Sequence, residues 1–518
     1  MRITDPTFEW FQLAPVLIVL AAACLGMLVE AFAPRKIRFF AQLVVAEIGL
    51  LCAAGLLVMN VQSGSVGKLA MGAIMFDGPT QVAWFALLGF CFLALMVFAE
   101  RNLNDGATAF AAAASAVPGS SVEAQAIAQR REHTEVFPLA LFSLSGMMVF
   151  AAANDLLTMF VALEVLSLPL YLLSGMARKR RLLSQEAALK YFLLGAFASA
   201  FFLFGLALLY GFSGAFELGE IGASLSTSTM NRGILLAGIG LMAVGVLFKV
   251  GVVPFQSWVP DVYTGAPTPV TGFMAICTKL AAVAGLSRVF FVALGGERWS
   301  WQPVLAVLAI LTMAVGVILA LTQTDIKRLL AYSAVSHAGF ILTAVVGAYQ
   351  DVPDGQLNSF GSIMFYLIGY GFAVIAAFAV VTVVRDGTGE ATDLDSWSGL
   401  GRKNPLLAGV FAFLLLSFAG IPLTAGFIGK WAVFAAAWSG GFSWLAVTAV
   451  AFSLVAAYFY IKVIVVMFFG EPAVGVSVGD ASMFTWIPIA VGAVATGCLG
   501  LFPAQVMEWL STAQIFLR

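Results

Sequence analysis

The chain is organised as long apolar runs separated by short polar linkers, and the runs have the length of membrane-spanning helices. A spanning helix needs about 20 mostly apolar residues. On that rule the pattern predicts about fourteen spans, near 15–33, 39–60, 79–99, 137–153, 156–176, 185–212, 233–253, 267–294, 304–322, 328–347, 359–384, 405–437, 443–469 and 484–510. The only long linker, 100–135, is rich in Asn, Ala, Gly and Ser, which predicts a partly disordered loop or a short surface helix. We therefore expect an all-α integral membrane protein that forms a single transmembrane domain.

Composition supports a chain that lies in the lipid bilayer. Hydrophobic residues make up 61% of the sequence and charged residues only 10%, whereas soluble domains are about one quarter charged. The net charge of −1 argues against a nucleic-acid partner. Asp5 and Glu9 precede the first apolar run, and the basic cluster at 35–38 follows it. This order favours a retained first helix over a cleaved signal peptide.

Cysteine and histidine usage argues against metal, haem and iron–sulfur sites. The five cysteines stand singly inside apolar runs, at Cys24, Cys52, Cys91, Cys277 and Cys498. Only two histidines, His133 and His337, are present. Neither metal-ligand spacing nor a Cys/His cluster occurs, so we expect no redox centre in this chain.

The distribution of Lys and Arg predicts how the chain is oriented. With the N-terminus outside, the inner loops hold fifteen basic residues: Arg35, Lys36, Arg38, Arg101, Arg130, Arg131, Arg178, Lys179, Arg180, Arg181, Lys327, Arg328, Arg385, Arg402 and Lys403. The outer side holds six: Arg2, Lys68, Arg232, Arg288, Arg298 and Arg518. Because basic residues favour cytoplasmic loops, both termini are expected outside the bacterial inner membrane.

Five basic residues remain, and all are lysines inside predicted spans: Lys190, Lys249, Lys279, Lys430 and Lys462. A charge at bilayer depth costs about 2.5–3.5 kcal/mol or more, so such residues usually face the bundle interior and mark ion or proton pathways. Glu164 lies mid-span among apolar and small residues and supplies an acidic partner. A buried lysine near a carboxylate can be switched between holding and releasing a proton. Glu30, near a span end, and Glu47, alone in its span, are weaker candidates.

Some of these residues have simpler explanations. Lys190 and Glu186 are four apart near a helix start and could form a local ion pair. Lys462 lies near the end of its span and could extend its charge to the interface. His337 could be a hydrogen-bonded core histidine, although its near-neutral pKa also suits a relay. Lys249, Lys279 and Lys430 lie too deep for the interfacial explanation.

Two spans are interrupted by helix breakers beside a lysine. Pro254 follows Lys249, and Gly420, Pro422 and Gly426 precede Lys430. Broken helices at this depth are tolerated inside protein or along a water-filled cavity, and breaks in corresponding positions of two halves indicate a transport path. The breaks fall in the seventh and twelfth spans, which predicts inverted repeats of spans four to eight (136–294) and nine to thirteen (304–469). Three N-terminal helices (1–99), a cytoplasmic loop (100–135) and a last helix (484–510) complete the arrangement.

At these segments the sequence resembles the antiporter-like N subunit family of bacterial proton-pumping NADH:quinone oxidoreductase (complex I). The resemblance rests on "ALEVLSLPLYLLSG", "EAALKYFLLGAFASAFFLFGLALLYG", "FKVGVVPFQSWVPDVYTGAPTPVTGFMAICTKLAA", "QTDIKRLLAYSAVSHAGF" and "GIPLTAGFIGKW", within roughly residues 150 to 435. The related L and M subunits and the multi-subunit sodium/proton antiporters share the broken helices. The third and fourth segments are closer to N, and the long C-terminal extension of L is lacking.

The resemblance implies a membrane subunit that moves protons outward, using energy from quinone reduction in neighbouring subunits. It implies that NADH, FMN, iron–sulfur clusters and quinone all bind to partner subunits of complex I. Glu164 would match the family's glutamate and Lys249 its partner lysine, with Lys190 between them, Lys279 central and Lys430 terminal. Gln256 stands where many members are expected to have histidine, which puts one polar contact near the break in doubt.

Two other function classes remain open on the sequence alone. A subunit of a cation/proton antiporter, or a self-sufficient Na⁺ or K⁺ antiporter, would share the repeats, but its cation would need carboxylate or carbonyl ligands at mid-membrane. The deep charges here are mostly lysines, which favours protons. A quinone-binding redox subunit would need a cofactor motif that the sequence lacks.

Overall fold

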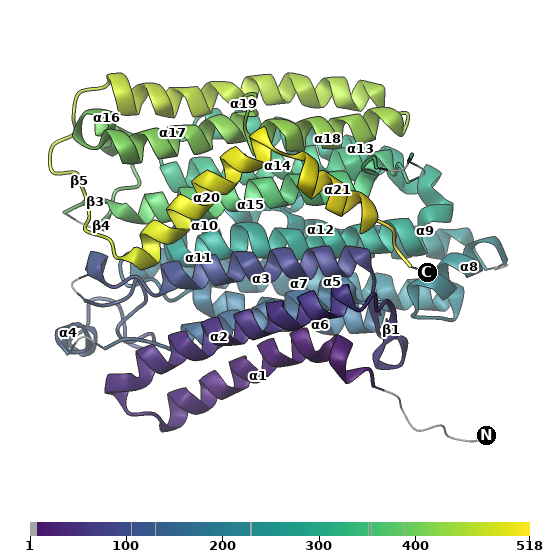
Figure 1. Ribbon diagram of the computed structural model, residues 1–518, viewed down its shortest axis with the longest axis horizontal. Helices are drawn as coiled ribbons and strands as arrows, with labels where there is room; N and C mark the ends of the chain where they lie inside the picture. The colour runs from purple at the N-terminus through teal and green to yellow at the C-terminus, as the bar shows by residue number, and fades with distance from the viewer. Residues whose placement is uncertain are drawn as a thin grey trace.

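The computed structural model describes residues 8–104, 106–129, 131–227, 230–350, 352–353, 355–387 and 389–517. Arg2, Asp5, Arg130 and Arg518, which entered the charge analysis, lie outside these residues. The described chain is a bundle of long helices that run roughly alongside one another (Figure 1). The predicted all-α membrane fold is confirmed.

The long helices follow the predicted spans. They are α1 (Trp10–Phe32), α2 (Arg35–Gln62), α3 (Gly78–Phe98), α5 (Val136–Ala152), α6 (Leu156–Ser174), α7 (Arg181–Ser213), α9 (Arg232–Val250), α10 (Trp258–Gly265), α11 (Thr268–Phe273), α12 (Lys279–Arg288), α13 (Arg298–Leu321), α14 (Ile326–Gly347), α15 (Ser359–Val383), α17 (Pro405–Ala419), α18 (Ala425–Ser439), α19 (Ser443–Phe469) and α20 (Met483–Leu501). Twelve helical segments of the described chain are long and apolar enough to cross a membrane. The shorter α5 and the α17–α18 pair occupy the other two predicted spans, so each of the fourteen falls on a helix or a helix pair.

The remaining elements are short. The helical ones are η1 (Ala70–Gly72), η2 (Asn102–Asn104), α4 (Ser121–Ala128), α8 (Leu218–Thr227), η3 (Phe255–Ser257), η4 (Met274–Thr278), η5 (Val289–Ala293), η6 (Gly295–Glu297), η7 (Leu394–Trp397), α16 (Leu400–Lys403) and α21 (Ala504–Thr512). Strands β1 (Gly67–Leu69) and β2 (Ile74–Phe76) form an antiparallel hairpin, while β3 (Val384–Asp386) pairs antiparallel with β4 (Gly389–Glu390) and β5 (Ser477–Val478). Helix α4 gives the 100–135 linker the short helix that was one of its two predicted forms.

The two ends of the bundle carry different elements. Helix α1 starts, and α21 ends, at the same end, which also carries α8 and β1 (Figure 1). We call it the terminal end. Helix α4 and strands β3 to β5 lie at the other end, which we call the opposite end. An even number of crossings requires both chain ends to lie on one side, as this arrangement has them.

The two predicted repeats share one pattern of backbone hydrogen bonds. In the first, the chain before α6 pairs with the chain after α7: Leu156 N–H donates to Phe216 C=O (3.1 Å), and Leu218 N–H donates to Asn154 C=O (2.9 Å). In the second, Ile326 N–H donates to Thr392 C=O (2.7 Å), and Leu394 N–H donates to Thr324 C=O (2.6 Å). The first pairing lies beside α8 and the second beside β4, at opposite ends of the bundle. This is the relation expected of inverted repeats.

Both broken helices end their first half in the same way. Gly251 and Gly420 each cap a half-helix at φ +83°, a left-handed conformation that glycine adopts without strain. In both, the two N–H groups that follow the half-helix return to one carbonyl, that of Leu247 for α9 and of Leu416 for α17. The helix breaks predicted from Pro and Gly are therefore confirmed.

Burial separates a protein-facing centre from a peripheral shell. Segment Thr268–Ala293 is completely buried and Ile326–Gly347 is buried except at Arg328, whereas α2 and α19 bury only about a third of their apolar windows. Arg288 was counted among the six basic residues of the outer side, inside the predicted span 267–294, but its burial was not predicted. Its guanidinium is fully buried in Thr268–Ala293, with a bidentate ion pair to Asp77 (2.7 and 3.0 Å) at the start of α3.

Candidate functional site

Lys249 occupies the last turn of α9, directly before the break, and is buried. Its Nζ lies 4.9 Å from the centre of the Tyr191 ring and 5.2 Å from that of Tyr171. Within the described residues Nζ has no hydrogen-bond partner. Cation–π contacts stabilise an ammonium by about 2 kcal/mol when desolvated. No hydrogen bond therefore fixes Lys249 in one protonation state.

Glu164 lies on α6, the helix that also carries Tyr171. Its Oε1 is buried and, within the described chain, lacks a hydrogen-bond partner. Glu164 and Lys249 form no ion pair within 4.0 Å, but the carboxylate is near enough to act on Lys249 electrostatically. The two groups expected to interact are therefore neighbours without contact, and the aromatic ring of Tyr171 lies against the ammonium.

Lys279 begins α12, immediately after the π-helical segment η4. Such π-bulges inside α-helices occur frequently at functional sites. The buried Lys279 Nζ donates a hydrogen bond to the Ala334 carbonyl on α14 and lies 5.3 Å from the centre of the Tyr370 ring. A narrow void lined by Lys249, Lys279 and Trp258 lies between the two lysines. Since the void has no room for a water molecule, a proton could cross it only after the site widens.

His337 is a buried relay candidate on α14, between Lys279 and Lys430. Its Nδ1 is hydrogen-bonded to the Tyr366 hydroxyl, and its Nε2 lies 3.2 Å from the Tyr460 hydroxyl. The His337 ring lies tilted against the ring of Tyr370 (4.6 Å between centroids), the same ring that Lys279 approaches. His337 is thus hydrogen-bonded as a core histidine would be, and its partners are titratable hydroxyls.

Lys430 lies in α18, after the second break. The buried Nζ donates to the Ala419 carbonyl (2.9 Å), at the end of the first half-helix, and to Ser453 Oγ (2.8 Å) on α19. It also lies 5.0 Å from the centre of the Phe340 ring, one turn from His337 on α14. The broken helix thus supplies the carbonyl that solvates the lysine, as breaks at this depth permit.

Lys190 differs from the other candidates because its side chain is 42% exposed. Its Nζ forms ion pairs with Glu186 and with Asp261 of α10, both at 2.7 Å. Asp261 also pairs with Arg328 of α14 (3.0 Å). The local ion pair that the sequence left open is present, and it extends into a network that links α7, α10 and α14. Lys462 is half-buried on the peripheral helix α19.

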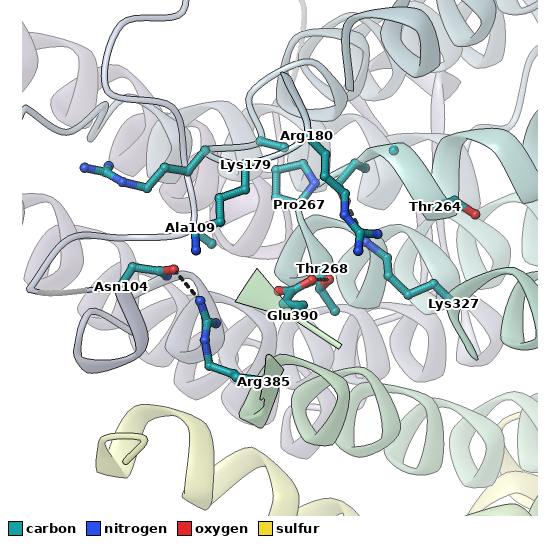
Figure 2. A pocket seen from close by; sticks show the side chains of 14 residues that line it. Asn104, Ala109, Lys179, Arg180, Thr264, Pro267, Thr268, Lys327, Arg385 and Glu390 are labelled. Atoms are coloured by element: carbon teal, nitrogen blue, oxygen red, sulfur yellow. Dashed lines mark hydrogen bonds between the residues drawn. The ribbon is translucent and has the colours of Figure 1, made fainter. Parts of the chain in front are cut away.

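A polar cavity of about 60 Å³ opens at the opposite end, where the 175–180 linker meets the start of α14 (Figure 2). Lys327 is buried there and donates to the Ala266 carbonyl (2.9 Å). Glu390 accepts a hydrogen bond from the Thr268 hydroxyl at the start of α11. Arg180 and Arg385 point into the same region. Lys327 begins the helix that carries His337, so this cavity lies at one end of the central helices.

The sequence analysis missed the tyrosines that surround the buried amines. Tyr171 and Tyr191 contact Lys249, and Tyr366, Tyr370 and Tyr460 surround His337. A signal was available, because these five are among only ten tyrosines in the chain and all lie inside apolar spans. Buried hydroxyls usually have a hydrogen-bond partner, so tyrosines at this depth could have been added to the candidates.

None of the residues that the structure describes form a group of three or more His, Cys, Asp or Glu able to hold a metal ion. The five cysteines are free. The titratable side chains that the described site brings together are amines, a carboxylate, an imidazole and hydroxyls, which can exchange protons.

Comparison with known proteins identifies the family. The model of the family described as NADH:quinone oxidoreductase/Mrp antiporter matches residues 153–456. The NADH-quinone oxidoreductase subunit N of a Nocardioides species is 52% identical, over 100% of both chains. The subunit N of Cutibacterium acnes is 50% identical, over 100% of this chain and 97% of the relative.

A solved structure shows the same relationship. A chain of respiratory complex I from Thermus thermophilus superposes with a TM-score of 0.75 at 32% identity, covering 95% of this chain and 98% of that one. The chain therefore belongs to the NADH:quinone oxidoreductase/Mrp antiporter family, and within it to the subunit N proteins of NADH-quinone oxidoreductase.

Proposed function

We propose that this chain is a proton-translocating membrane subunit of a bacterial NADH:quinone oxidoreductase. Protons would move along Glu164, Lys249, Lys279, His337 and Lys430, driven by quinone reduction in partner subunits. The observation that carries the proposal is that Lys249, Lys279 and Lys430 are buried in one row across both repeats, each without an ion pair among the described residues. Buried lysines kept only for stability would need such partners.

The proposal gives Lys190 a different place from the other five residues. Lys190 is half exposed and paired with two carboxylates, so we assign it to the margin of the path, where it orients α10 beside Lys249. The path itself then runs through groups that a single proton can occupy in turn, because no described residue of opposite charge lies within 4.0 Å of any of them.

The proposal assigns every redox cofactor to partner subunits: NADH, FMN, the iron–sulfur clusters and quinone. It places the chain in the bacterial inner membrane with the terminal end outside and the opposite end in the cytoplasm. The basic residues of the 35–38, 178–181 and 402–403 segments lie at the opposite end, as the positive-inside rule requires. Other membrane subunits of the complex would flank the peripheral helices.

Cation/proton antiport is the alternative that the family leaves open. The described residues offer no cluster of carboxylates for a metal cation, whereas three buried lysines can carry protons but cannot ligate Na⁺. Purification through a tag on this chain should yield a flavin- and iron–sulfur-containing complex. That complex, in vesicles, should take up protons on NADH addition in sodium-free buffer. A free chain without these cofactors, or a strict requirement for Na⁺, would contradict the proposal.

A further inference from the structure

A second, larger cavity of about 550 Å³ lies at the opposite end, away from the lysine row. Its walls are the turn between α1 and α2 and the segment on either side of α4. Thr134 joins the two walls, because its hydroxyl donates a hydrogen bond to Glu30 at the end of α1. The charged residues that line the cavity include Arg35, Lys36, Arg38, Arg131, Glu132 and Glu135.

Each carboxylate of this cavity is already engaged within the chain. Glu30 pairs with Arg38 (2.7 Å), and Glu132 pairs with Arg101 (2.8 Å) and accepts from the Thr108 N–H. Glu135 forms an ion pair with His133. Burial raises the pKa of Glu135, but the hydrogen bond and charge of His133, a backbone hydrogen bond and the charge of Arg38 together hold that pKa below its usual range.

The cations are not balanced in the same way. Arg35, Lys36 and Arg131 are exposed and line the cavity, and none of them forms an ion pair with any residue in the described ranges. The side chain of Arg131 contacts only the neutral Gln129 (2.9 Å) among the polar partners found. Three positive charges therefore face one cavity without an ion-pair partner among the described residues.

The cavity is bordered by apolar surface suited to lipid. On its α1–α2 wall Phe32, Ile37 and Phe40 are 83%, 56% and 69% exposed. On its other wall α4 presents Val122 and Ile127, also exposed. Helices α1 and α2 are peripheral and bury only about a third of their apolar windows. A molecule that fills this cavity thus needs an anionic head beside acyl chains.

We propose that this cavity binds the headgroup of an anionic phospholipid, with Arg35, Lys36 and Arg131 contacting its phosphate and the acyl chains lying along α1 and α2. Basic pockets at the cytoplasmic ends of membrane helices bind such headgroups, and each Lys or Arg near the surface strengthens the preference for anionic lipid about fivefold. The site is separate from the proton path and does not depend on it.

The test uses the assembled complex in phosphatidylcholine vesicles that contain a trace of photoactivatable phosphatidylglycerol or, in a parallel sample, photoactivatable phosphatidylcholine. After illumination, labelled peptides are identified by mass spectrometry. Segments 28–40 and 117–131 should be labelled preferentially by phosphatidylglycerol. Arg131→Gln should lower that preference about fivefold, and Arg131→Gln with Lys36→Gln should lower it further. Arg402→Gln removes an exposed cation elsewhere at the same end and should leave it unchanged.

Competition distinguishes the possible occupants. Inorganic phosphate should not displace the lipid, because it lacks acyl chains, and displacement would identify a soluble anion as the occupant and overturn the proposal. Equal labelling by the two lipids would also overturn it. So would labelling that does not change when Arg131→Gln and Lys36→Gln are introduced. Cross-linking of the cavity residues to an acidic segment of a neighbouring subunit would show that protein fills the site.

Discussion

Lys249 and Lys430 are both buried amines at helix breaks, yet they are solvated differently. Lys430 donates hydrogen bonds to a carbonyl and a hydroxyl, whereas the Lys249 amine lies against aromatic rings and has no hydrogen-bond partner among the described residues. Replacing Lys249 by a permanently charged side chain should therefore reduce proton pumping more than the same replacement at the other lysines. Arginine keeps its proton at any accessible pH, and its larger planar group must fit between Tyr171 and Tyr191.

The Lys249→Arg complex is expected to assemble but to lose proton pumping, together with NADH:quinone turnover, by at least about tenfold. The reason is that a guanidinium cannot release the proton it carries. Turnover of the purified complex measures this, with the flavin-site reduction of an artificial acceptor as the control for assembly. Wild-type pumping in Lys249→Arg would show that this position needs only a positive charge.

Tyr366→Phe tests the relay around His337. The substitution removes the hydroxyl bound to Nδ1 and leaves a buried imidazole with one partner, a loss of about 1–3 kcal/mol. We expect slower proton pumping and inactivation of the complex at a lower temperature. Tyr458→Phe is the matched control, because Tyr458 is 65% exposed. If Tyr366→Phe pumps as fast as that control, the Tyr366 hydroxyl has no part in the relay.

At the scale of elements, Gly420 ties the broken helix α17–α18 to Lys430. A Cβ at Gly420 would lie 2.9 Å from Lys430 Cδ and 3.3 Å from its Nζ. Alanine in this left-handed conformation costs about 1–2 kcal/mol. Gly420→Ala should therefore displace Lys430 from Ala419 and Ser453 and reduce pumping. Gly409→Ala in the same helix meets open space and should leave pumping intact. Equal proton pumping by both variants would show that Gly420 at the helix break does not position Lys430.

The buried Arg288–Asp77 pair joins α12 to α3. Removing one member of such a pair leaves an uncompensated charge and costs about 3–5 kcal/mol. Arg288→Ala should therefore lower the yield of assembled complex, as judged by sedimentation of detergent extracts. Arg298→Ala is the matched control at the same end, because Arg298 is exposed, lies against the ring of Trp299 and forms no ion pair with the described residues. Unchanged yield with Arg288→Ala would show that the pair does not stabilise the fold.

The elements could be predicted from the sequence because lipid imposes strong one-dimensional signals. A run of about 20 apolar residues defines a span, and Gly420 or Pro254 beside a lysine defines a break. Depth along a helix is visible in the sequence, but rotation about its axis is not. For this reason Lys190 was placed among the lysines inside spans although it faces an exposed network, and the full burial of Arg288, which was counted among the outer basic residues, was not predicted.

The two repeats carry opposite charges in the second halves of their broken helices. Asp261 lies as far after Gly251 as Lys430 lies after Gly420, and the two residues lie in the second halves of the broken helices, α10 and α18. The opposite charges at these positions make the repeats chemically different despite their common hydrogen-bond pattern. The two repeats thus share a backbone hydrogen-bond pattern although their sequences are only weakly similar.

At the scale of the whole molecule, the orientation is testable by labelling. In a background where the cysteines are replaced, Lys179→Cys places a thiol at the opposite end and Val66→Cys places one on the β1–β2 hairpin at the terminal end. A membrane-impermeant maleimide added to intact cells should label the Val66→Cys chain only. After the membrane is opened, the Lys179→Cys chain should also be labelled. The reverse pattern would place the termini inside.

The central claim is that one continuous row of buried groups carries protons across both repeats, and Lys279 lies at its middle. The most direct measurement is proton uptake recorded together with NADH oxidation in vesicles that contain the fully assembled Lys279→Ala complex. The peripheral Lys462→Ala complex serves as the control. We predict that Lys279→Ala loses proton uptake and most NADH oxidation, by at least about tenfold, while Lys462→Ala retains both. Normal proton uptake by an assembled Lys279→Ala complex would contradict the claim.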